Sequence, residues 1–442
     1  MRLSRLSASL VGAAILVLPL AAPALAQNEQ FVPGLVYRTG PYAPNGIPFA
    51  NGRADYVTLI NERDGGINGV RLVYEECETG YATDRGVECY ERLKNKGPTG
   101  ASGFSPLSTG ITFALTEKVP GDKIPLLTQG YGRSESVDGS VFPWNFPMLG
   151  TYWDAADILV QYVAQQAGGV DKLKGKRIAL VYHDSPYGKE PIPVLEDHSK
   201  KYGFKFDALP VTHPGVEQKS TWLQVRQSRP DWVFLWGWGV MNSTAIKEAV
   251  AVGYPRNKIY GVWWSGAEPD VEPAGDGAKG YNALALHPSG SDFPVHQEVF
   301  KYVYDKGKGT ANREDVGKVL YNRGLIDGML MVEAIRTAQA KFGNGKPMTG
   351  EQIRWGFENL SISAERLKEL GFEGLMSPVS VSCNDHAGAH KARVHQWDGK
   401  KWNFVSDWIE ADYTYLGPKV KEAAKEYATQ KNITPRDCAK ES

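Results

Sequence analysis

Apolar and polar segments alternate along the chain in a way that predicts an α/β protein. Short apolar runs of strand length end at turn residues, and stretches of helix length follow them. The runs predicted to be strands are 30–37, 70–74, 124–128, 177–182, 231–236 and 259–263. The stretches predicted to be helices are 49–63, 87–96, 111–119, 188–202, 245–252, 295–306, 319–341 and 351–359. Such alternation is typical of parallel sheets that helices cover on both faces.

The alternation occurs twice, at roughly 30–150 and 150–280, which predicts two similar doubly wound α/β lobes. Residues 377–408 have the pattern of strands and turns, with Asp398-Gly399 as a hairpin signal. Because no low-complexity linker separates the two parts, we expect interleaved lobes rather than two domains on a tether.

The first 26 residues have the three parts of a secretory signal peptide. Arg2 and Arg5 precede an apolar run at 10–20, and Ala24-Leu25-Ala26 offers a cleavage site of small residues. The apolar run is shorter than the ~20 residues of a membrane-spanning helix, and no cysteine follows it as a lipid anchor would need. We therefore expect an exported, periplasmic protein that is soluble after cleavage.

Four cysteines in an exported chain predict two disulfides. Four cysteines allow three pairings. We favour Cys77–Cys89, which closes a short local loop, and Cys383–Cys438, which would fasten the C-terminal tail. No C-x-x-C motif supports a redox or zinc-ribbon site.

Composition excludes several classes of protein. Apolar residues make up 42% and charged residues 23%, which excludes a disordered chain. Lys plus Arg and Asp plus Glu both number 50, so no basic excess indicates a nucleic-acid partner. Aromatic residues are the enriched class, with 12 Trp and 21 Tyr.

Ligands of parallel sheets bind at the carboxyl ends of the strands, and this rule selects the loops of interest. Ser108 and Thr109 begin a predicted helix, whose N-terminus can hold a carboxylate; the alternative is that either residue only caps the helix. Four tryptophans at strand ends indicate a stacking pocket for an apolar or aromatic group, although each could serve only in packing. These are Trp236, Trp238, Trp263 and Trp264.

Tests for enzyme motifs fail. Gly237-Trp238-Gly239 begins like a dinucleotide fingerprint, but Asn242 occupies the third glycine position. No P-loop, H-E-x-x-H or G-x-S-x-G motif is present. His386, His390 and His395 lie near Asp385, but a metal site is disfavoured in what is predicted to be an exposed turn and strand. We expect neither catalysis nor a cofactor or metal.

Motifs in a fixed order then show a resemblance to a known family. They are Thr39–Gly46, Asn61–Gly69, Ser108-Thr109-Gly110, Ile124–Thr128, Asp184–Gly188, Asp231 with its strand, and Gly275–Gly280. Each motif is weak, but their order over residues 30–400 resembles the branched-chain amino acid type of periplasmic solute-binding proteins.

The resemblance implies a type I periplasmic binding protein fold, with two lobes joined by three hinge crossings. With crossings near 149, 281 and 376, the implied boundaries are 1–26 for the signal peptide, 27–149 and 282–375 for lobe 1, and 150–281 and 376–442 for lobe 2. The implied partners are a small-molecule ligand and the membrane permease subunits of an ABC importer, and we expect a monomer.

The resemblance also implies roles for individual residues. Ser108 and Thr109, together with Gln129, Gly130 and Tyr131, would hold the ligand carboxylate in lobe 1, and Tyr42 would cover it. From lobe 2, the residues that would close on the ligand are Tyr187, Trp238, Trp263, Trp264 and Ser265. Tyr321 would lie near a crossing.

One departure from the family pattern affects the ligand. Amino-acid binders of this family pair the ligand ammonium with an acidic residue after the strand that ends near 264, but here the first acidic residue is Glu268. Asp184 is a possible substitute. A buried ammonium without a carboxylate partner would be costly. The leading hypothesis is therefore a carboxylate with an aromatic or bulky apolar body and no amine.

Several alternatives remain open. Branched-chain amino acids are the second choice of ligand, and short amides or urea-like solutes are the third. A ligand sensor that docks onto a membrane receptor, or an exported hydrolase, would be alternatives to a transport receptor.

Overall fold

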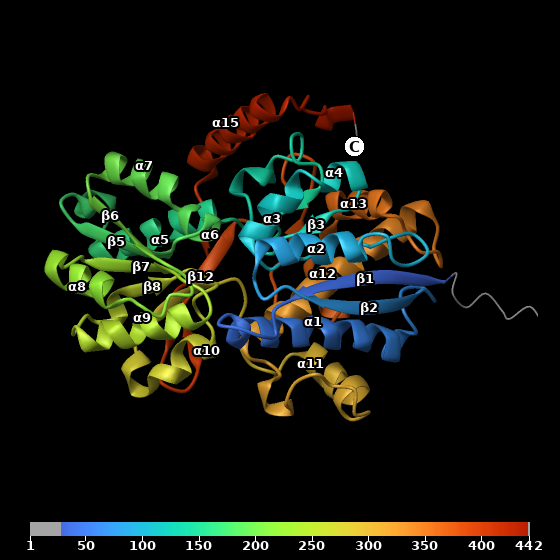
Figure 1. Cartoon of the computed structure of the whole chain (residues 1–442), viewed down its shortest axis with the longest axis horizontal. Coiled ribbons are helices and arrows are strands. Elements are labelled where there is room, and N and C mark those ends of the chain that lie inside the picture. Colours follow the sequence, from blue (N-terminus) through green and yellow to red (C-terminus); the bar gives the residue numbers. More distant parts are fainter. Residues whose placement is uncertain (1–27, 441–442) are drawn as a thin grey trace, which may run out of the picture.

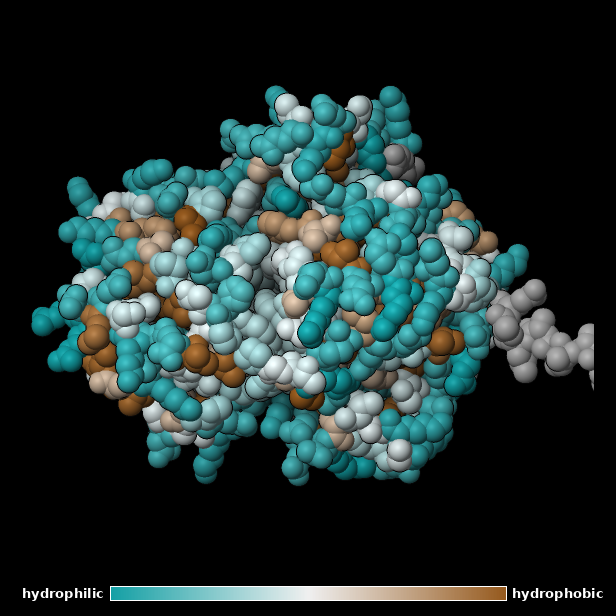
Figure 2. Space-filling view, viewed as in Figure 1, coloured by the Kyte–Doolittle hydropathy of each residue, from teal (hydrophilic) through white to brown (hydrophobic). Residues whose placement is uncertain are grey.

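The computed structural model describes residues 28–440, and the predicted signal peptide lies outside them. The chain forms two α/β lobes side by side, with lobe 2 on the left and lobe 1 on the right of Figure 1. Hydrophilic residues cover most of the face in the space-filling view (Figure 2). No helix among residues 28–440 is long and apolar enough to cross a membrane.

The lobe 1 sheet is built from parallel strands and bridges. Strands β1 (Glu29–Val36) and β2 (Arg71–Glu78) pair in parallel, as do β3 (Leu126–Leu127) and β4 (Asn145–Phe146). Single bridges at Phe31–Ala101 and Phe104–Leu126 connect the two pairs. All these pairings are parallel, so the loops that follow the strands share one edge of the sheet.

The helices of lobe 1 come from two parts of the chain. They are α1 (Ala43–Asp64), α2 (Thr83–Leu93), α3 (Thr109–Thr116), α4 (Val119–Asp122), α11 (Pro294–Val299), α12 (Val319–Phe342), α13 (Gly350–Glu358) and α14 (Ala364–Glu369). Helices α1 and α12 cross closely, because a Cβ at Gly324 would lie 2.1 Å from the carbonyl oxygen of Phe49. Only glycine permits this approach, and it brings the first turns of α12 beside the junction of the lobes.

Lobe 2 contains the larger sheet, in the order β13-β12-β9-β8-β7-β5-β6 with β14 beside β12. The five parallel strands are β5 (Arg177–His183), β6 (Lys205–Val211), β7 (Trp232–Trp236), β8 (Ile259–Gly261) and β9 (Asn282–Ala285). The antiparallel strands are β12 (Lys391–Trp397), β13 (Trp402–Phe404) and β14 (Ile409–Glu410). The Asp398-Gly399 hairpin is confirmed between β12 and β13.

The helices of lobe 2 follow its strands. They are α5 (Tyr152–Ala167), α6 (Pro186–Lys189), α7 (Ile192–Tyr202), α8 (Lys219–Ser228), α9 (Val240–Ala251) and α10 (Glu268–Val271). The single helix expected at 188–202 is therefore two helices, because Pro191 and Pro193 interrupt it.

Three segments connect the lobes: 147–151, 286–293 and 381–390. They follow β4, β9 and β11 (Val379–Ser380), a short strand that pairs with β10 (Ser361–Ile362). Because β9 is hydrogen-bonded into the lobe 2 sheet, the second connection begins after residue 285, a few residues beyond the predicted position near 281.

The C-terminal helix α15 (Tyr413–Lys431) runs across the junction of the lobes, at the top of Figure 1. Its first half contacts lobe 2, where Tyr415 and Lys419 both bond Asp197 at 2.8 Å. Its second half packs on lobe 1, where Tyr427 lies against Phe142. The tail therefore contacts both lobes, and not lobe 2 alone as its predicted assignment implies.

Both favoured disulfides are present. Cys77–Cys89 joins β2 to α2, with Cα atoms 5.7 Å apart. Cys383–Cys438 fastens the tail beyond α15 to the segment after β11.

Candidate ligand-binding site

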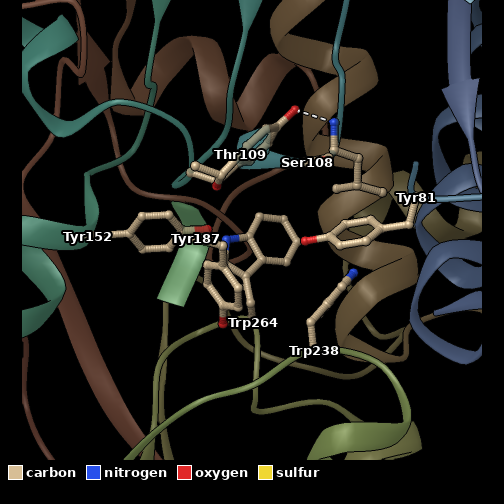
Figure 3. Close-up of a pocket in the computed structure, with 9 residues that line it drawn as sticks. Tyr81, Ser108, Thr109, Tyr152, Tyr187, Trp238 and Trp264 are labelled. Atoms are coloured by element: carbon tan, nitrogen blue, oxygen red, sulfur yellow. Dashed lines mark hydrogen bonds between the residues drawn. The ribbon is translucent and has the colours of Figure 1, made fainter. Parts of the chain in front are cut away.

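A small cavity lies between the lobes, with a volume of about 20 Å³. Nine residues line it: Tyr81, Leu107, Ser108, Thr109, Tyr131, Tyr152, Tyr187, Trp238 and Trp264. In Figure 3, Ser108 and Thr109 lie on one side and the two tryptophans on the opposite side. Tyr81 and Tyr152 approach from opposite ends. None of the nine residues carries a charged side chain, so the pocket is a box of aromatic rings and hydroxyls.

Lobe 1 contributes residues that follow its parallel strands. Tyr81 follows β2, residues 107–109 lead into α3, and Tyr131 follows β3. The Tyr131 hydroxyl accepts a 2.7 Å hydrogen bond from the backbone nitrogen of Leu107, which joins two of these loops. Ser108 Oγ accepts from Ile111 N at 3.3 Å, so Ser108 is the helix cap that the alternative reading proposed.

Thr109 contributes the other hydroxyl of the α3 turn, which is buried beside the Tyr152 phenol. Its side-chain oxygen has no hydrogen-bond partner among residues 28–440, and the residue is 2% exposed. A buried hydroxyl without a partner costs free energy unless a ligand or water satisfies it. Because Thr109 also begins a helix, the partner favoured at this position is an anion or another hydrogen-bond acceptor.

Lobe 2 supplies the opposite wall from the ends of its strands. Trp238 follows β7 and Trp264 follows β8, and their rings lie 5.4 Å apart at 87°. Tyr187 in α6 donates to the carbonyl oxygen of Gly237 at 2.9 Å, which fixes its ring. Burial raises the pKa of the Tyr187 phenol well above its ordinary value, so the wall stays uncharged at neutral pH.

The indole nitrogens of this wall bond lobe 1 rather than the cavity. Trp263 and Trp264 both donate to the carbonyl oxygen of Gly130, at 2.7 and 2.9 Å. Trp238 donates to the Tyr37 hydroxyl at 3.0 Å. Trp238 and Trp264 therefore offer aromatic surface to the pocket, while the N–H groups of all three tryptophans bond lobe 1.

Further contacts join the lobes beside the pocket. The Tyr42 hydroxyl lies 2.7 Å from Nε2 of His183. Asn45 donates to Asp270 at 2.9 Å. With the indole contacts, these bonds close the cleft on both sides of the cavity. We refer to them together as the interlobe hydrogen bonds.

The pocket includes six of the predicted ligand-binding residues: Ser108, Thr109, Tyr131, Tyr187, Trp238 and Trp264. The other eight do not line it: Tyr42, Gln129, Gly130, Trp236, Trp263, Ser265, Glu268 and Tyr321. Tyr42, Gly130 and Trp263 form interlobe hydrogen bonds instead.

The remaining predicted residues are held within the protein. Ser265 Oγ donates to Gly237 O at 2.8 Å, and Trp236 is fully buried in lobe 2. Tyr321 donates to Asp55 at 2.7 Å. Gln129 is buried, and its amide has no partner in the described part of the chain.

Three lining residues were missed by the sequence analysis: Tyr81, Leu107 and Tyr152. Tyr81 follows the end of β2, so the strand-end rule could have selected it. Tyr152 is the first residue of α5, a helix that the sequence analysis did not predict, and no pattern pointed to it.

The histidines considered as metal ligands have separate partners. His386 lies between Glu358 and the carbonyl oxygen of Asn145. His390 contacts Asp154 and Asp385, at 3.0 and 3.1 Å. No group of three His, Cys, Asp or Glu residues in the described chain is placed to hold a metal ion.

Comparison with protein families shows what kind of protein this is. The model of the periplasmic binding protein family matches residues 29–401. The chain belongs to this family. Periplasmic binding proteins of ABC transporters bind small molecules and interact with membrane permeases, and they are not enzymes. A search of curated proteins found no match.

Solved structures agree with this assignment. One, described as an ABC transporter permease from the Pseudomonas fluorescens group, shares 47% identity with a TM-score of 0.86, over 93% of this chain and 99% of that one. A branched chain amino acid ABC transporter from Thermus thermophilus with bound valine shares 20% sequence identity. Its TM-score is 0.72, and the match covers 88% of this chain and 98% of that one. A solute binding protein from R. palustris in complex with benzoate shares 15% sequence identity. Its TM-score is 0.64, and the match covers 87% of this chain and 98% of that one. The last two show the fold alone.

Proposed function

We propose that this periplasmic binding protein is the receptor of an ABC importer for a compact carboxylate with an aromatic or branched apolar body and no amine. The observation that carries the proposal is the pocket wall, which combines six aromatic side chains with hydroxyls and contains no charged group. Relatives of the same fold are described with valine or with benzoate bound, so the scaffold accepts both kinds of ligand.

The acidic residues near the pocket argue against a ligand ammonium. Glu268 accepts from the backbone nitrogen of Val319 at 3.0 Å and does not line the pocket. Asp184 pairs with Lys189 at 2.8 Å, and its side chain is 41% exposed. An amino-acid ligand would bury its ammonium against aromatic rings and hydroxyls, without the carboxylate that offsets desolvation.

The turn at the start of α3 supports a carboxylate. The Thr109 hydroxyl and the positive end of the helix dipole both favour an anion at this wall. The ligand carboxylate would face Ser108 and Thr109, and its apolar body would lie against Trp238 and Trp264. Thr109→Val, which removes the hydroxyl but keeps the shape, should weaken carboxylate binding by about tenfold.

Transport would use closure of the two lobes on the ligand. The interlobe hydrogen bonds would form on closure and create the surface that the permease accepts. In this proposal the hinge crossings are the three connecting segments, the mature protein is a periplasmic monomer, and residues 1–26 are removed on export. Branched-chain amino acids are the second candidate ligands, followed by short amides and urea-like solutes.

A thermal-shift screen of the mature, refolded protein tests the proposal, since refolding removes retained ligand. The panel contains benzoate-type and cinnamate-type acids, branched-chain and aromatic amino acids, and short amides. A ligand at 100 times its Kd stabilises the protein by about 2.7 kcal/mol, a shift of a few degrees. Shifts with apolar carboxylates support the proposal, and shifts with amino acids or amides alone reject it.

A further inference from the structure

A buried arginine lies behind the aromatic wall of the pocket. Arg323, in the second turn of α12, is fully buried. Its Nη1 donates to the carbonyl oxygen of Trp263 at 2.5 Å, and its Nε donates to Nε2 of His287 at 3.2 Å. Its Nη2 has no partner within residues 28–440. Arg323 thus holds the junction of the lobes through neutral acceptors.

This cation is stacked on a ring that forms the pocket wall. The Arg323 guanidinium carbon lies 4.6 Å from the centroid of the Trp264 ring system. Trp264 lines the pocket and Arg323 does not, so the indole separates the cation from the ligand. A ligand in van der Waals contact with the indole, about 3.5 Å away, would lie about 8 Å from the guanidinium.

The surrounding groups leave the charge of Arg323 only partly balanced. No carboxylate of residues 28–440 forms an ion pair with it within 4.0 Å. The Asp270 and Glu268 carboxylates attract Arg323 at longer range, but each is hydrogen-bonded elsewhere. Asp270 is bonded to Asn45, Asn242 and the backbone of Ala267, and Glu268 to the backbone of Val319. His287 stays neutral, since burial and the neighbouring arginine lower its pKa to about 3.

An aromatic box of this kind would otherwise suit a cation, because ring faces attract ammonium groups. Here one of the two indoles, Trp264, already stacks on a cation, which would repel a second cation across the indole. The same charge would attract a carboxylate. We propose that Arg323 sets the charge preference of the pocket, so that it binds a carboxylate and rejects a cation of the same shape. This inference rests on the proposed function and adds the residue responsible for it.

The test uses three planar probes of nearly one shape: benzoate, benzamide and benzamidine, which carry charges of −1, 0 and +1. Their Kd values are measured by isothermal titration with the wild-type protein, Arg323→Met, Arg323→Lys and Lys341→Met. At a separation of about 8 Å and an effective dielectric constant of about 20, one unit charge changes affinity by about 30-fold. The wild type should bind benzoate most tightly and benzamidine least.

The variants separate charge from structure. Arg323→Met should weaken benzoate by about 30-fold, leave benzamide within about threefold, and strengthen benzamidine. Arg323→Lys should keep the order of the wild type. Lys341→Met removes a cation stacked on Trp355 at the exposed end of the same helix and should change no Kd. Thermal unfolding of each variant confirms that it is folded.

The outcomes distinguish failure of the role proposed for Arg323 from failure of the proposed ligand class. Equal losses for all three probes in Arg323→Met, or an unchanged preference for benzoate, would overturn the role of Arg323 but leave the proposed ligand class intact. If benzamidine binds the wild type most tightly, the charge preference is wrong. If no probe binds and the isobutyrate, isobutyramide and isobutyramidine series also fails, both the inference and the proposed ligand class are rejected.

Discussion

Acidification should open the closed form of the protein through His183. This residue ends β5 in lobe 2, is 1% exposed, and meets the Tyr42 hydroxyl of lobe 1 at 2.7 Å. Burial and the stacked His213 ring, 4.7 Å away, lower the pKa of His183 from its ordinary 6.5 to about 4. Asp184 opposes this shift, and the phenols of Tyr81 and Tyr187 face the ring without charge.

The direction of the pH dependence of closure follows from which form of the protein binds the proton more readily. Because the closed form lowers the pKa of His183, the open form binds the proton more readily, and closure weakens as pH falls below 6.5. With a pKa of 6.5 in the open form and about 4 in the closed form, closure at pH 5 is weaker than at pH 7 by about 20-fold. Below pH 4 both forms are protonated, and the dependence levels off.

The assay is titration calorimetry with the best carboxylate of the ligand screen, at pH 7 and pH 5, where a benzoate-type acid is still mostly ionised. The wild-type Kd should rise by about 20-fold. His183→Gln keeps a polar group at this position but cannot titrate, so this rise in Kd should be absent. His296→Gln serves as the control, since His296 is buried within lobe 1 and bonded to Asn322. Equal pH dependence in the wild type and His183→Gln would refute the reasoning.

Three further predictions concern single contacts. Trp263→Phe removes a hydrogen bond to Gly130 O without touching the pocket, and it should weaken ligand binding by about fivefold in titration calorimetry; an unchanged Kd would mean that this bond does not support closure. Replacing Cys383 and Cys438 by serine opens a disulfide that spans 55 residues, and urea unfolding should show a loss of about 4 kcal/mol; a loss below about 1 kcal/mol would contradict a fastened tail. Glu268→Gln should change ligand affinity by less than about twofold, because this carboxylate bonds the Val319 backbone; a hundredfold loss would assign it to the ligand.

The sheets could be predicted from the sequence because their strands are apolar runs that end at turns. Several helices and strands were not predicted, and for two of them, β6 and α15, the reason is local. β6 is exposed at Lys205, Ala208 and Pro210, and an edge strand tolerates such a proline. α15 has 19 residues and contains Gly417 and Pro418 in its second turn. Both residue types disfavour a helix interior, so the sequence pattern did not predict this helix.

The site could be predicted only in part. The strand-end rule located the wall residues Ser108, Thr109, Trp238 and Trp264, since it depends on topology alone. It could not separate Trp263 from Trp264, because both indoles donate to a carbonyl oxygen more than 130 residues earlier in the chain. Hydrogen bonds between residues so far apart in the sequence depend on how the two lobes meet, and no local sequence pattern predicts that arrangement.

The central claim is that the pocket binds a carboxylate without an amine, and matched ligand pairs test it most directly. Leucine and 4-methylpentanoate differ only in the ammonium, as do phenylalanine and 3-phenylpropanoate. Titration calorimetry of the refolded protein should give a lower Kd for the deaminated member of each pair, by about tenfold or more, because no free carboxylate lines the cavity. Tighter binding of the amino acid in either pair would contradict the account.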